Sequence, residues 1–376
     1  YSLHPNDTEY PREYPTFGRN PDGTTRDTGD PAQIMLVTMR VDSEGNKIAF
    51  DDPAWDTFMD QLTYDDLVSI LSVGARKTGG LDAVAKPQTA DNNGPNGYNQ
   101  KYNSNKLGLA YRTEVKKGNV DQDGKLTDGR DPDGDKKTTA MPTNGILAGA
   151  FNKDLAYKAG KIIGEDGIWA GQAGLYGIGA NIHRTPYSGR NAEYYSECGM
   201  LTGIVAGYEC KGIEEKGVHV YNKHCALNDQ ENSRHGIATW TTEQAARELY
   251  LRAFELPILI GNAYNVMASF NRLGVQPAPG CGALGTDFLR GECGMEGIIV
   301  TDAYGDMCGY YGVAAYYQHP YGIYYGGCDI PDGDNIKTDD GRMLYDLYAP
   351  DADGNGDYAR MAWRMRESVK RVMYAC

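Results

Sequence analysis

The sequence has no long hydrophobic run. A helix needs about eighteen apolar residues to span a membrane, and no apolar stretch of this chain approaches that length. Residues 1–30 also lack the apolar region of a signal peptide. Positive charge is scarce, because 37 Lys and Arg stand against 51 Asp and Glu, for a net charge of −14. This balance argues against nucleic acid and acidic membranes as partners. We expect a soluble protein without a membrane span, secreted or in a bacterial-type cytoplasm, that binds a neutral ligand.

Closely spaced cysteine pairs are missing as well. None of the eight cysteines lies in the first half of the chain, which excludes a disulfide framework across it but leaves a single bridge open. Without close pairs we expect no structural zinc. The Asp-rich segments 113–137 and 351–356 fail the spacing of a calcium-binding EF-hand loop, so we interpret them as solvated loops. We therefore expect no metal and no cofactor.

Phenylalanine is rare, with 7 residues against 28 tyrosines, and amphipathic rings at that density suit stacking on sugars or other polar-faced ligands. No G-x-G-x-x-G loop follows a predicted strand, which argues against a doubly wound dinucleotide-binding sheet. Strand patterns occur at residues 34–41, 175–182, 218–221, 265–270 and 298–301, and helical patterns at 55–74, 152–171, 193–215, 242–260, 286–291 and 358–374. This alternation predicts an α/β protein, a (β/α)8 TIM-like barrel over residues 54–376 with loop insertions, preceded by a lead-in segment at 1–53.

Polar clusters follow three of the predicted strands. Asp302 ends the strand at 298–301, where it either serves chemistry or caps the next helix. The other clusters are His183, Arg184, Arg190, Asn191 and Glu193, and Lys223, His224, Asn228, Asp229, Glu231 and Arg234. In a barrel all three clusters meet at one mouth. There the cations would keep Asp302 ionised and bind the hydroxyls of a neutral sugar, unless the clusters form only a structural ion-pair network.

Four segments together resemble the barrel domain of glycoside hydrolase family three, the β-glucosidase family. They are NIHRTPYSGRNAEYYSE (181–197), KHCALNDQENSR (223–234), EQAARELYLRAFELPI (243–258) and GIIVTDAYGDM (297–307). The resemblance, which runs from about residue 55 to 375, implies that Asp302 is the nucleophile of a retaining mechanism. It also implies that Arg190, Lys223, His224 and Arg234 bind the hydroxyls of the terminal sugar in subsite −1.

The chain departs from the family pattern at several positions. The family loop Asp-Gly-Pro-x-Gly-x-Arg corresponds to residues 93–99, NGPNGYN, so Asn93 replaces the sugar-binding Asp unless Asp91 has taken its place. Phe270 stands where a Tyr commonly lies near the nucleophile, and Ala303 stands where a Trp often follows it. The Pro-Gly-His-Gly and Asp-Ser-His signatures of the branch that cleaves N-acetylglucosamine are missing, which favours the glucosidase-like branch.

The acid/base of the family is a Glu on an α/β-sandwich domain, and we expect that domain to be absent from these 376 residues and to contact the barrel as a partner. A retaining mechanism needs two carboxyl groups about 5–5.5 Å apart. The resemblance therefore predicts a retaining β-glucosidase-like exo-hydrolase that acts on terminal β-D-glucosyl units of oligosaccharides or of aryl or alkyl glucosides. Two alternatives stay open: a non-catalytic sugar-binding barrel, and a hydrolase of another β-glycoside such as a β-xyloside.

Overall fold

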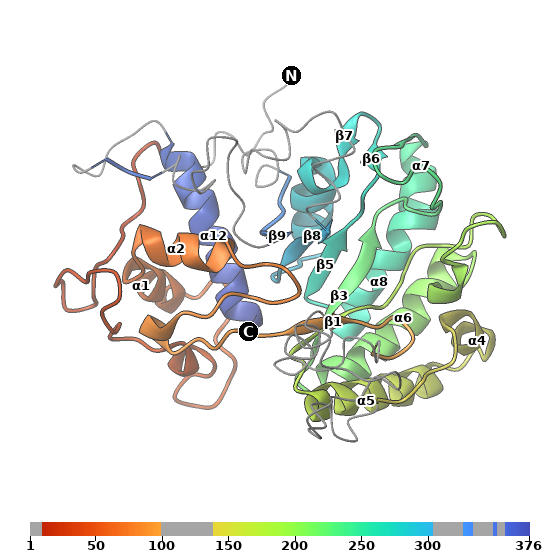
Figure 1. Ribbon diagram of the computed structural model, residues 1–376, viewed down its shortest axis with the longest axis horizontal. Helices are drawn as coiled ribbons and strands as arrows, with labels where there is room; N and C mark the ends of the chain where they lie inside the picture. Colours follow the sequence, from red (N-terminus) through yellow and green to blue (C-terminus); the bar gives the residue numbers. More distant parts are fainter. Residues whose placement is uncertain (1–9, 99–137, 304–325, 334–348, 352–357) are drawn as a thin grey trace, which may run out of the picture.

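The computed structural model describes residues 10–98, 138–303, 326–333, 349–351 and 358–376 (Figure 1). The predicted loops at 113–137 and 352–356 lie outside the described residues. The α-helices are α1 (Ala54–Asp60), α2 (Tyr64–Leu71), α4 (Asn144–Gly149), α5 (Lys153–Ala170), α6 (Gly199–Glu214), α7 (Glu243–Ala245), α8 (Arg252–Gly261) and α12 (Ala359–Ala375), with π-helical stretches at Ala246–Leu251 and Ala283–Glu292. The strands are β1 (Asp91–Asn93), β2 (Gly174–Tyr176), β3 (His219–Cys225), β4 (Ala238–Thr239), β5 (Asn265–Ala268), β6 (Arg272–Leu273), β7 (Gln276–Pro277), β8 (Ile299–Ala303) and β9 (Ile330–Asp332).

Within the described residues, the main sheet has six strands in the order β1-β2-β3-β5-β8-β9, and every neighbouring pair is parallel. Helices α5, α6 and α8 lie along one face of this sheet (Figure 1). Since parallel neighbours require crossovers, the strand–helix alternation in the sequence correctly predicts an α/β fold with a curled parallel sheet. A small sheet of β4, β6 and β7 stands beside it.

The two faces of the main sheet have different partners. Alternate strand residues pack beneath the helices, among them Leu175, Val220, Val266 and Ile299. The residues between them face the interior of the curled sheet, and they include Tyr176, Tyr221, Met267, Val300 and Ile330. Because side chains alternate along a strand, Lys223, Asp302 and Asp332 also face the interior, each two residues beyond one of these apolar positions. Their strands therefore carry a polar layer at the carboxyl ends, above an apolar one.

The two edges of the main sheet are joined by the chain between α2 and β1. Gly74 N donates to Gly333 O at 3.1 Å just beyond β9, while Asp91 N in β1 donates to Arg76 O at 2.9 Å. A Cβ on Gly74 would lie 2.0 Å from the carbonyl oxygen of Pro331, so this close approach requires glycine. Residues 74–76 thus close the ring of hydrogen bonds among the described residues. The count of eight strands stays a prediction.

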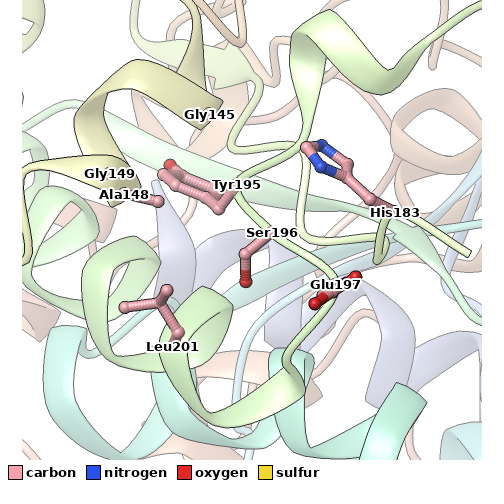
Figure 2. Close-up of a pocket in the computed structure, with 8 residues that line it drawn as sticks. All are labelled: Gly145, Ala148, Gly149, His183, Tyr195, Ser196, Glu197 and Leu201. Atoms are coloured by element: carbon pink, nitrogen blue, oxygen red, sulfur yellow. The ribbon is translucent and has the colours of Figure 1, made fainter. Parts of the chain in front are cut away.

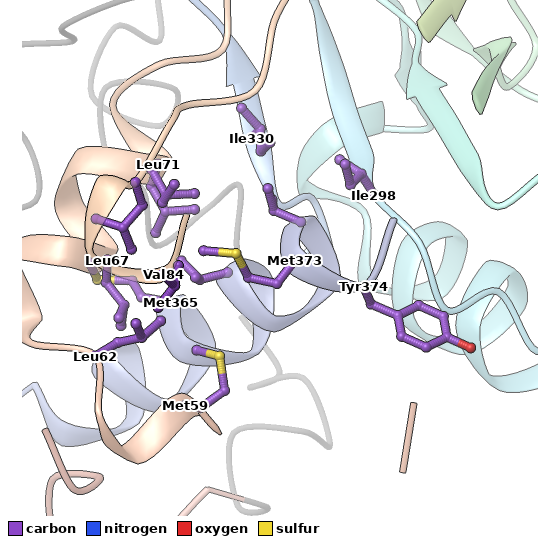
Figure 3. Close-up of a cluster of buried hydrophobic side chains, with 14 of the residues drawn as sticks. Met59, Leu62, Leu67, Leu71, Val84, Ile298, Ile330, Met365, Met373 and Tyr374 are labelled. Carbon is purple, nitrogen blue, oxygen red and sulfur yellow. The ribbon is translucent and has the colours of Figure 1, made fainter. Parts of the chain in front are cut away.

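Helix α12 packs against the interior of the sheet, the lead-in segment and the first two helices. Met365 and Met373 of α12 lie in one apolar cluster with Leu62, Leu67 and Ile330 (Figure 3). The lead-in segment is tied to α2 by a buried ion pair, in which Arg26 Nη1 lies 2.7 Å from Asp66 Oδ2. The segment therefore packs on the helices beside the sheet.

Two predictions about the N-terminal part are wrong. The strand expected at 34–41 is a short 3-10 helix, Leu36–Met39. The main-chain N–H and C=O of Ile34 bond to the side chain of Gln61 and not to a strand. The single helix expected at 55–74 is two helices, because Thr63 and Asp66 form a capping box that starts α2 anew.

Three boundaries also differ from the sequence-based expectation. Residues 91–93, expected in a polar loop, form β1 through parallel pairing with β2. The strand expected at 175–182 ends at Tyr176, and Ile178 has a left-handed φ of 55°. The helix expected at 193–215 begins only at Gly199. The expected helices at 152–171, 242–260 and 358–374 and the strands at 218–221, 265–270 and 298–301 are confirmed with small changes of boundary.

Candidate active site

Asp302 lies at the carboxyl end of β8, next to its last residue. Its Oδ1 accepts a hydrogen bond from Ala303 N at 2.8 Å. Its Oδ2 is buried and has no hydrogen-bond partner within the described part of the chain. Burial raises the pKa of this carboxyl, while the Ala303 N–H and the charges of Lys223, Arg190 and Arg234 act in the opposite direction. The cations thus favour the charged form of Asp302, as expected from the sequence, and burial opposes them.

Strand β3 carries two of the residues predicted from the sequence, Lys223 and His224, close to Asp302. His224 Nε2 lies 3.6 Å from Asp302 Oδ2, and the imidazole is buried. Burial, followed by the charges of Arg190, Lys223 and Arg234, lowers the pKa of His224 well below its ordinary value. A neutral imidazole thus faces the carboxylate, and its Nδ1 has no hydrogen-bond partner among the described residues.

The backbone of His224 is held by the side chain of Asn181. His224 N donates to Asn181 Oδ1 at 2.7 Å, and Asn181 Nδ2 donates to His224 O at 3.0 Å. The peptide bonds that follow Lys223 and Cys225 are cis. Asn181, the first residue of the 181–197 segment, is not predicted as a site residue from the sequence, because a side chain that holds a main chain leaves no spacing signal there.

Lys223 and Asn93 meet across the interior of the sheet. Lys223 Nζ donates to Asn93 Oδ1 at 3.1 Å. Burial lowers the pKa of Lys223 to about 8, as does the charge of Arg190, against the opposing effects of Glu193 and Asp302. At neutral pH the ammonium still carries most of its charge, so a cation and an amide stand together opposite Asp302.

Arg190 is oriented by Glu193 through two hydrogen bonds, from Nε to Oε1 at 3.1 Å and from Nη2 to Oε2 at 2.7 Å. Burial alone would lower the pKa of Arg190, but the bonds to Glu193 raise it above its ordinary value. The same pairing lowers the pKa of Glu193 in spite of burial, with Lys223 and Arg234 contributing. Both side chains are thus held charged.

Arg234 and Phe270 form a second contact at this mouth. The guanidinium carbon of Arg234 lies 4.7 Å from the centroid of the Phe270 ring, within the range of a cation–π interaction. Arg234 also pairs with Glu231, with Nη1 and Oε2 separated by 3.1 Å. The ring of Phe270 is buried, and His235 packs edge-on against it.

Asp91 lies apart from these residues. Its fully buried carboxylate is 3.2 Å from His219 Nε2, at the amino ends of β1 and β3. Asn93, two residues later, lies opposite Tyr176 and accepts the hydrogen bond from Lys223. The structure therefore joins Lys223 to Asn93 and places His224 beside Asp302. Asp91 lies deeper in the interior, beside His219.

One inward-facing carboxylate was not predicted from the sequence. Asp332 ends β9 and is partly buried, and its Oδ1 accepts a hydrogen bond from Arg76 N at 3.0 Å. Burial, together with the neighbouring charge of Asp302, raises its pKa to about 7. The only sequence signal is a three-residue strand containing a proline, too short to be recognised by periodicity.

A hollow of about 300 Å³ opens between α4 and the start of α6, and Asp302 is not part of its lining (Figure 2). Its lining is Gly145, Ala148, Gly149, His183, Tyr195, Ser196, Glu197 and Leu201. Of the three polar clusters predicted from the sequence, only His183 lines it. His183 Nε2 already contacts the carbonyl oxygens of Asn191 and Tyr194.

Among the residues that the structure describes, no group of three or more His, Cys, Asp and Glu side chains could hold a metal ion. The seven cysteines that it describes are all free, and Cys308 lies outside the described residues. No helix in the described ranges is long and apolar enough to cross a membrane.

Known proteins resemble this chain in sequence and in fold. Over 165 residues it is 34% identical to proteins named "Probable beta-glucosidase I" from Aspergillus flavus and Aspergillus oryzae, which is 44% of this chain and 20% of each relative. The β-glucosidase of Paenibacillus barengoltzii has the same fold, with a TM-score of 0.71 and 21% identity over 100% of this chain and 37% of that one. A β-glucosidase of Bifidobacterium adolescentis gives 0.62 and 26% over 84% of this chain and 40% of that one.

The aligned part spans only about a fifth of the length of the curated relatives. The family profile described as "Glycosyl hydrolase family 3 N terminal domain" matches residues 121–329, more than half of the chain. That region contains β2, β3, β5 and β8 with Lys223, His224 and Asp302. The chain therefore belongs to glycosyl hydrolase family 3 and carries its N-terminal, β-glucosidase-like hydrolase domain.

Proposed function

We propose that this chain is the catalytic barrel of a retaining β-glucosidase-like exo-hydrolase, in which Asp302 attacks the anomeric carbon of a terminal β-D-glucosyl unit. One observation carries the proposal. The Oδ2 atom of Asp302 is buried, lacks a hydrogen-bond partner in the described part of the chain, and experiences the positive charges of Lys223, Arg190 and Arg234. Such an oxygen is a nucleophile that has no structural bond to break.

In the first step a new bond forms between an Asp302 oxygen and the anomeric carbon, while the bond from that carbon to the leaving oxygen breaks. The leaving oxygen takes a proton from an acid that we place on a further domain, outside the described residues. Water then attacks the glycosyl-enzyme, its proton returns to that group, and Asp302 is released as a carboxylate. The configuration at the anomeric carbon is retained because it is inverted twice.

The cationic groups have separate tasks in this scheme. Lys223 and Arg190 supply donors for sugar hydroxyls and favour the charged form of Asp302 against the effect of burial. Neutral His224 is 3.6 Å from Asp302 Oδ2, so it can donate to the carboxylate or to a hydroxyl next to it. The clamp by Asn181 fixes the main chain of His224 and with it the position of the ring.

The choice of glucose rests on the relatives. The proteins with similar sequence are named β-glucosidases, and a solved structure with 25% identity is a β-glucosidase of Thermotoga neapolitana in complex with glucose, at a TM-score of 0.65. It covers 85% of this chain, and this chain covers 42% of it. Phe270 and Asn93 are less polar than the Tyr and Asp of the family pattern at these positions. A β-xyloside is the alternative substrate.

A burst experiment tests the proposal. Mixed with a dinitrophenyl β-glucoside, the chain should release about one equivalent of dinitrophenol quickly, because this leaving group hardly needs protonation. With an acid placed outside these 376 residues, alkyl glucosides should react about 10²–10⁴-fold less efficiently with this chain, relative to a two-domain family member, because they need the proton that this acid supplies. Tight glucose binding without any burst would make the chain a sugar-binding barrel, and a burst only with the xyloside would move the substrate to β-xylosides.

A further inference from the structure

The polar layer of the barrel contains a carboxylate in addition to Asp302. Asp332 ends β9, which pairs in parallel with β8, and the register sets Asp332 opposite Ala303, the neighbour of Asp302. Ile330, two residues earlier, is fully buried in the inner apolar cluster opposite Val300. Because side chains alternate along a strand, the Asp332 side chain points to the same interior as Ile330. The register between the two strands shifts between Val300 and Ala303, and the charge of Asp302 acts on the Asp332 carboxyl, so the two carboxyl groups are neighbours.

Only one oxygen of this carboxylate has a structural role in the described chain. Arg76 N donates to Oδ1 at 3.0 Å, and the main-chain N–H of Asp332 donates to Thr301 Oγ1 at 2.9 Å. The bond to Thr301 fixes the main chain of Asp332 on β8, and the bond from Arg76 fixes its side chain. Oδ2 makes no hydrogen bond to any described residue, and the residue is only partly buried, so this oxygen is available to a ligand.

The position of Asp332 in the ring of strands explains what the second oxygen can reach. Residues 74–76 connect β9 to β1, so Asp332 lies between Asp302 on β8 and Asn93 on β1. Lys223, which bonds to Asn93, also responds to the charges of Asp302 and Arg76. A sugar whose anomeric carbon is held at Asp302 would therefore lie against Asp332 and Asn93 with its other hydroxyls.

We propose that Asp332 binds sugar hydroxyls in subsite −1 and thereby supplies the negative charge that position 93 lacks in this chain. The inference rests on the proposed function for the location of the sugar. An ionised carboxylate accepts a hydroxyl more strongly than the amide of Asn93 does. Asp332 is thus a specificity-determining residue that selects for a hydroxyl on the side of the sugar facing β9 and β1.

The pKa of Asp332 makes the contact dependent on pH. Burial and the charge of Asp302 raise it to about 7, so below that pH the carboxyl is mostly neutral in the empty site. Arg76, whose N–H bonds to Oδ1, acts in the opposite direction, and Asp91 below adds a further rise. Discrimination for the selected hydroxyl should therefore grow as pH increases from 6 to 8.

The test is calorimetric titration of the full chain with glucose and with its 4-deoxy and 6-deoxy analogues. In Asp332→Asn the amide keeps the acceptor for Arg76 N, so the fold should persist. Glucose should bind this variant at least about tenfold more weakly, because a charge-assisted bond is lost, while one deoxy analogue should bind equally to both proteins. Glu197→Gln removes an exposed carboxylate in the hollow beside α4 and should leave all three affinities unchanged.

Equal losses for glucose and both analogues, or no loss for any of them, would overturn the role of Asp332. So would unchanged sugar affinity together with slower cleavage of alkyl but not of dinitrophenyl glucosides, since that pattern belongs to a general acid. Labelling of Asp302 by a 2-fluoro-glucoside separates this proposal from the proposed function. Failure of labelling with normal glucose binding rejects the nucleophile alone, whereas a wild-type chain that binds no glucose rejects both.

Discussion

Lys223 Nζ donates a hydrogen bond to Asn93 Oδ1 over 3.1 Å and so joins β3 to β1 across the interior of the sheet. The Asn93→Asp variant would turn this bond into an ion pair. We expect the pKa of Lys223 to rise from about 8, because a neighbouring negative charge favours the ammonium form. Glucose should bind about tenfold more tightly, which corresponds to about 1.4 kcal/mol.

Calorimetry at pH 7 and pH 9 measures both effects. In the unsubstituted chain glucose affinity should fall above pH 8 as Lys223 loses its proton, whereas in Asn93→Asp the fall should move to higher pH. Identical pH profiles for the two proteins would show that Asn93 does not control the charge of Lys223.

The neighbouring Asp91 should behave differently. Its buried carboxylate lies 3.2 Å from His219 Nε2 beneath the polar layer, so Asp91→Asn should lower the free energy of unfolding by about 1–3 kcal/mol. Glucose affinity should stay unchanged in the variant that remains folded. Urea unfolding and calorimetry measure the two quantities, and a large loss of affinity at constant stability would instead place Asp91 on the sugar.

Much of the fold could be predicted from the sequence because several elements have strong local patterns. Strand β8 contains consecutive apolar residues ending on Asp302, and α12 has Met361, Met365 and Val369 along one face. Strand β1, in contrast, has the sequence Asp-Asn-Asn, which disfavours a strand, and only its pairing with β2 makes it one.

The site residues, too, could be predicted where the local pattern is strong and not where the tertiary structure decides. Lys223, His224 and Asp302 were predicted from polar residues that follow apolar strands, and the structure places all three at the carboxyl ends of β3 and β8. The separation of Asp91 from Asn93 could not be predicted, because it depends on which layer of the interior each residue reaches. Asp332 was missed because β9 is short and its alternation becomes visible only beside Val300 and Ile330.

Two buried carboxyl groups of α6 make stability depend on pH. Burial raises the pKa of Glu209 to about 7, although its hydrogen bond from Tyr195 lowers it in part, and burial raises that of Glu214 to about 8. A group whose pKa is raised in the folded state holds its proton more tightly there than in the unfolded chain. The free energy of unfolding should therefore decrease as pH rises from about 4.5 to 8.

The Glu209→Gln variant tests this account. Glutamine keeps an acceptor for the Tyr195 hydroxyl, which lies 2.5 Å from Glu209 Oε2. The variant should be more stable than the unsubstituted chain at pH 8, by up to about 3 kcal/mol, and similar to it at pH 5. Urea unfolding across this range gives the slopes. The exposed Glu197→Gln serves as control, and an unchanged slope in Glu209→Gln would contradict the buried-carboxyl explanation.

The central claim is that Asp302 forms a covalent bond with the sugar. Incubation with a 2,4-dinitrophenyl 2-deoxy-2-fluoro-β-glucoside should trap the intermediate, and mass spectrometry of the digested chain should find one sugar on the peptide that contains Asp302. In Asp302→Asn, whose amide is nearly isosteric but cannot attack, the label should be absent while the protein stays folded. Label that persists in this variant, on a different peptide, would contradict the assignment of the nucleophile.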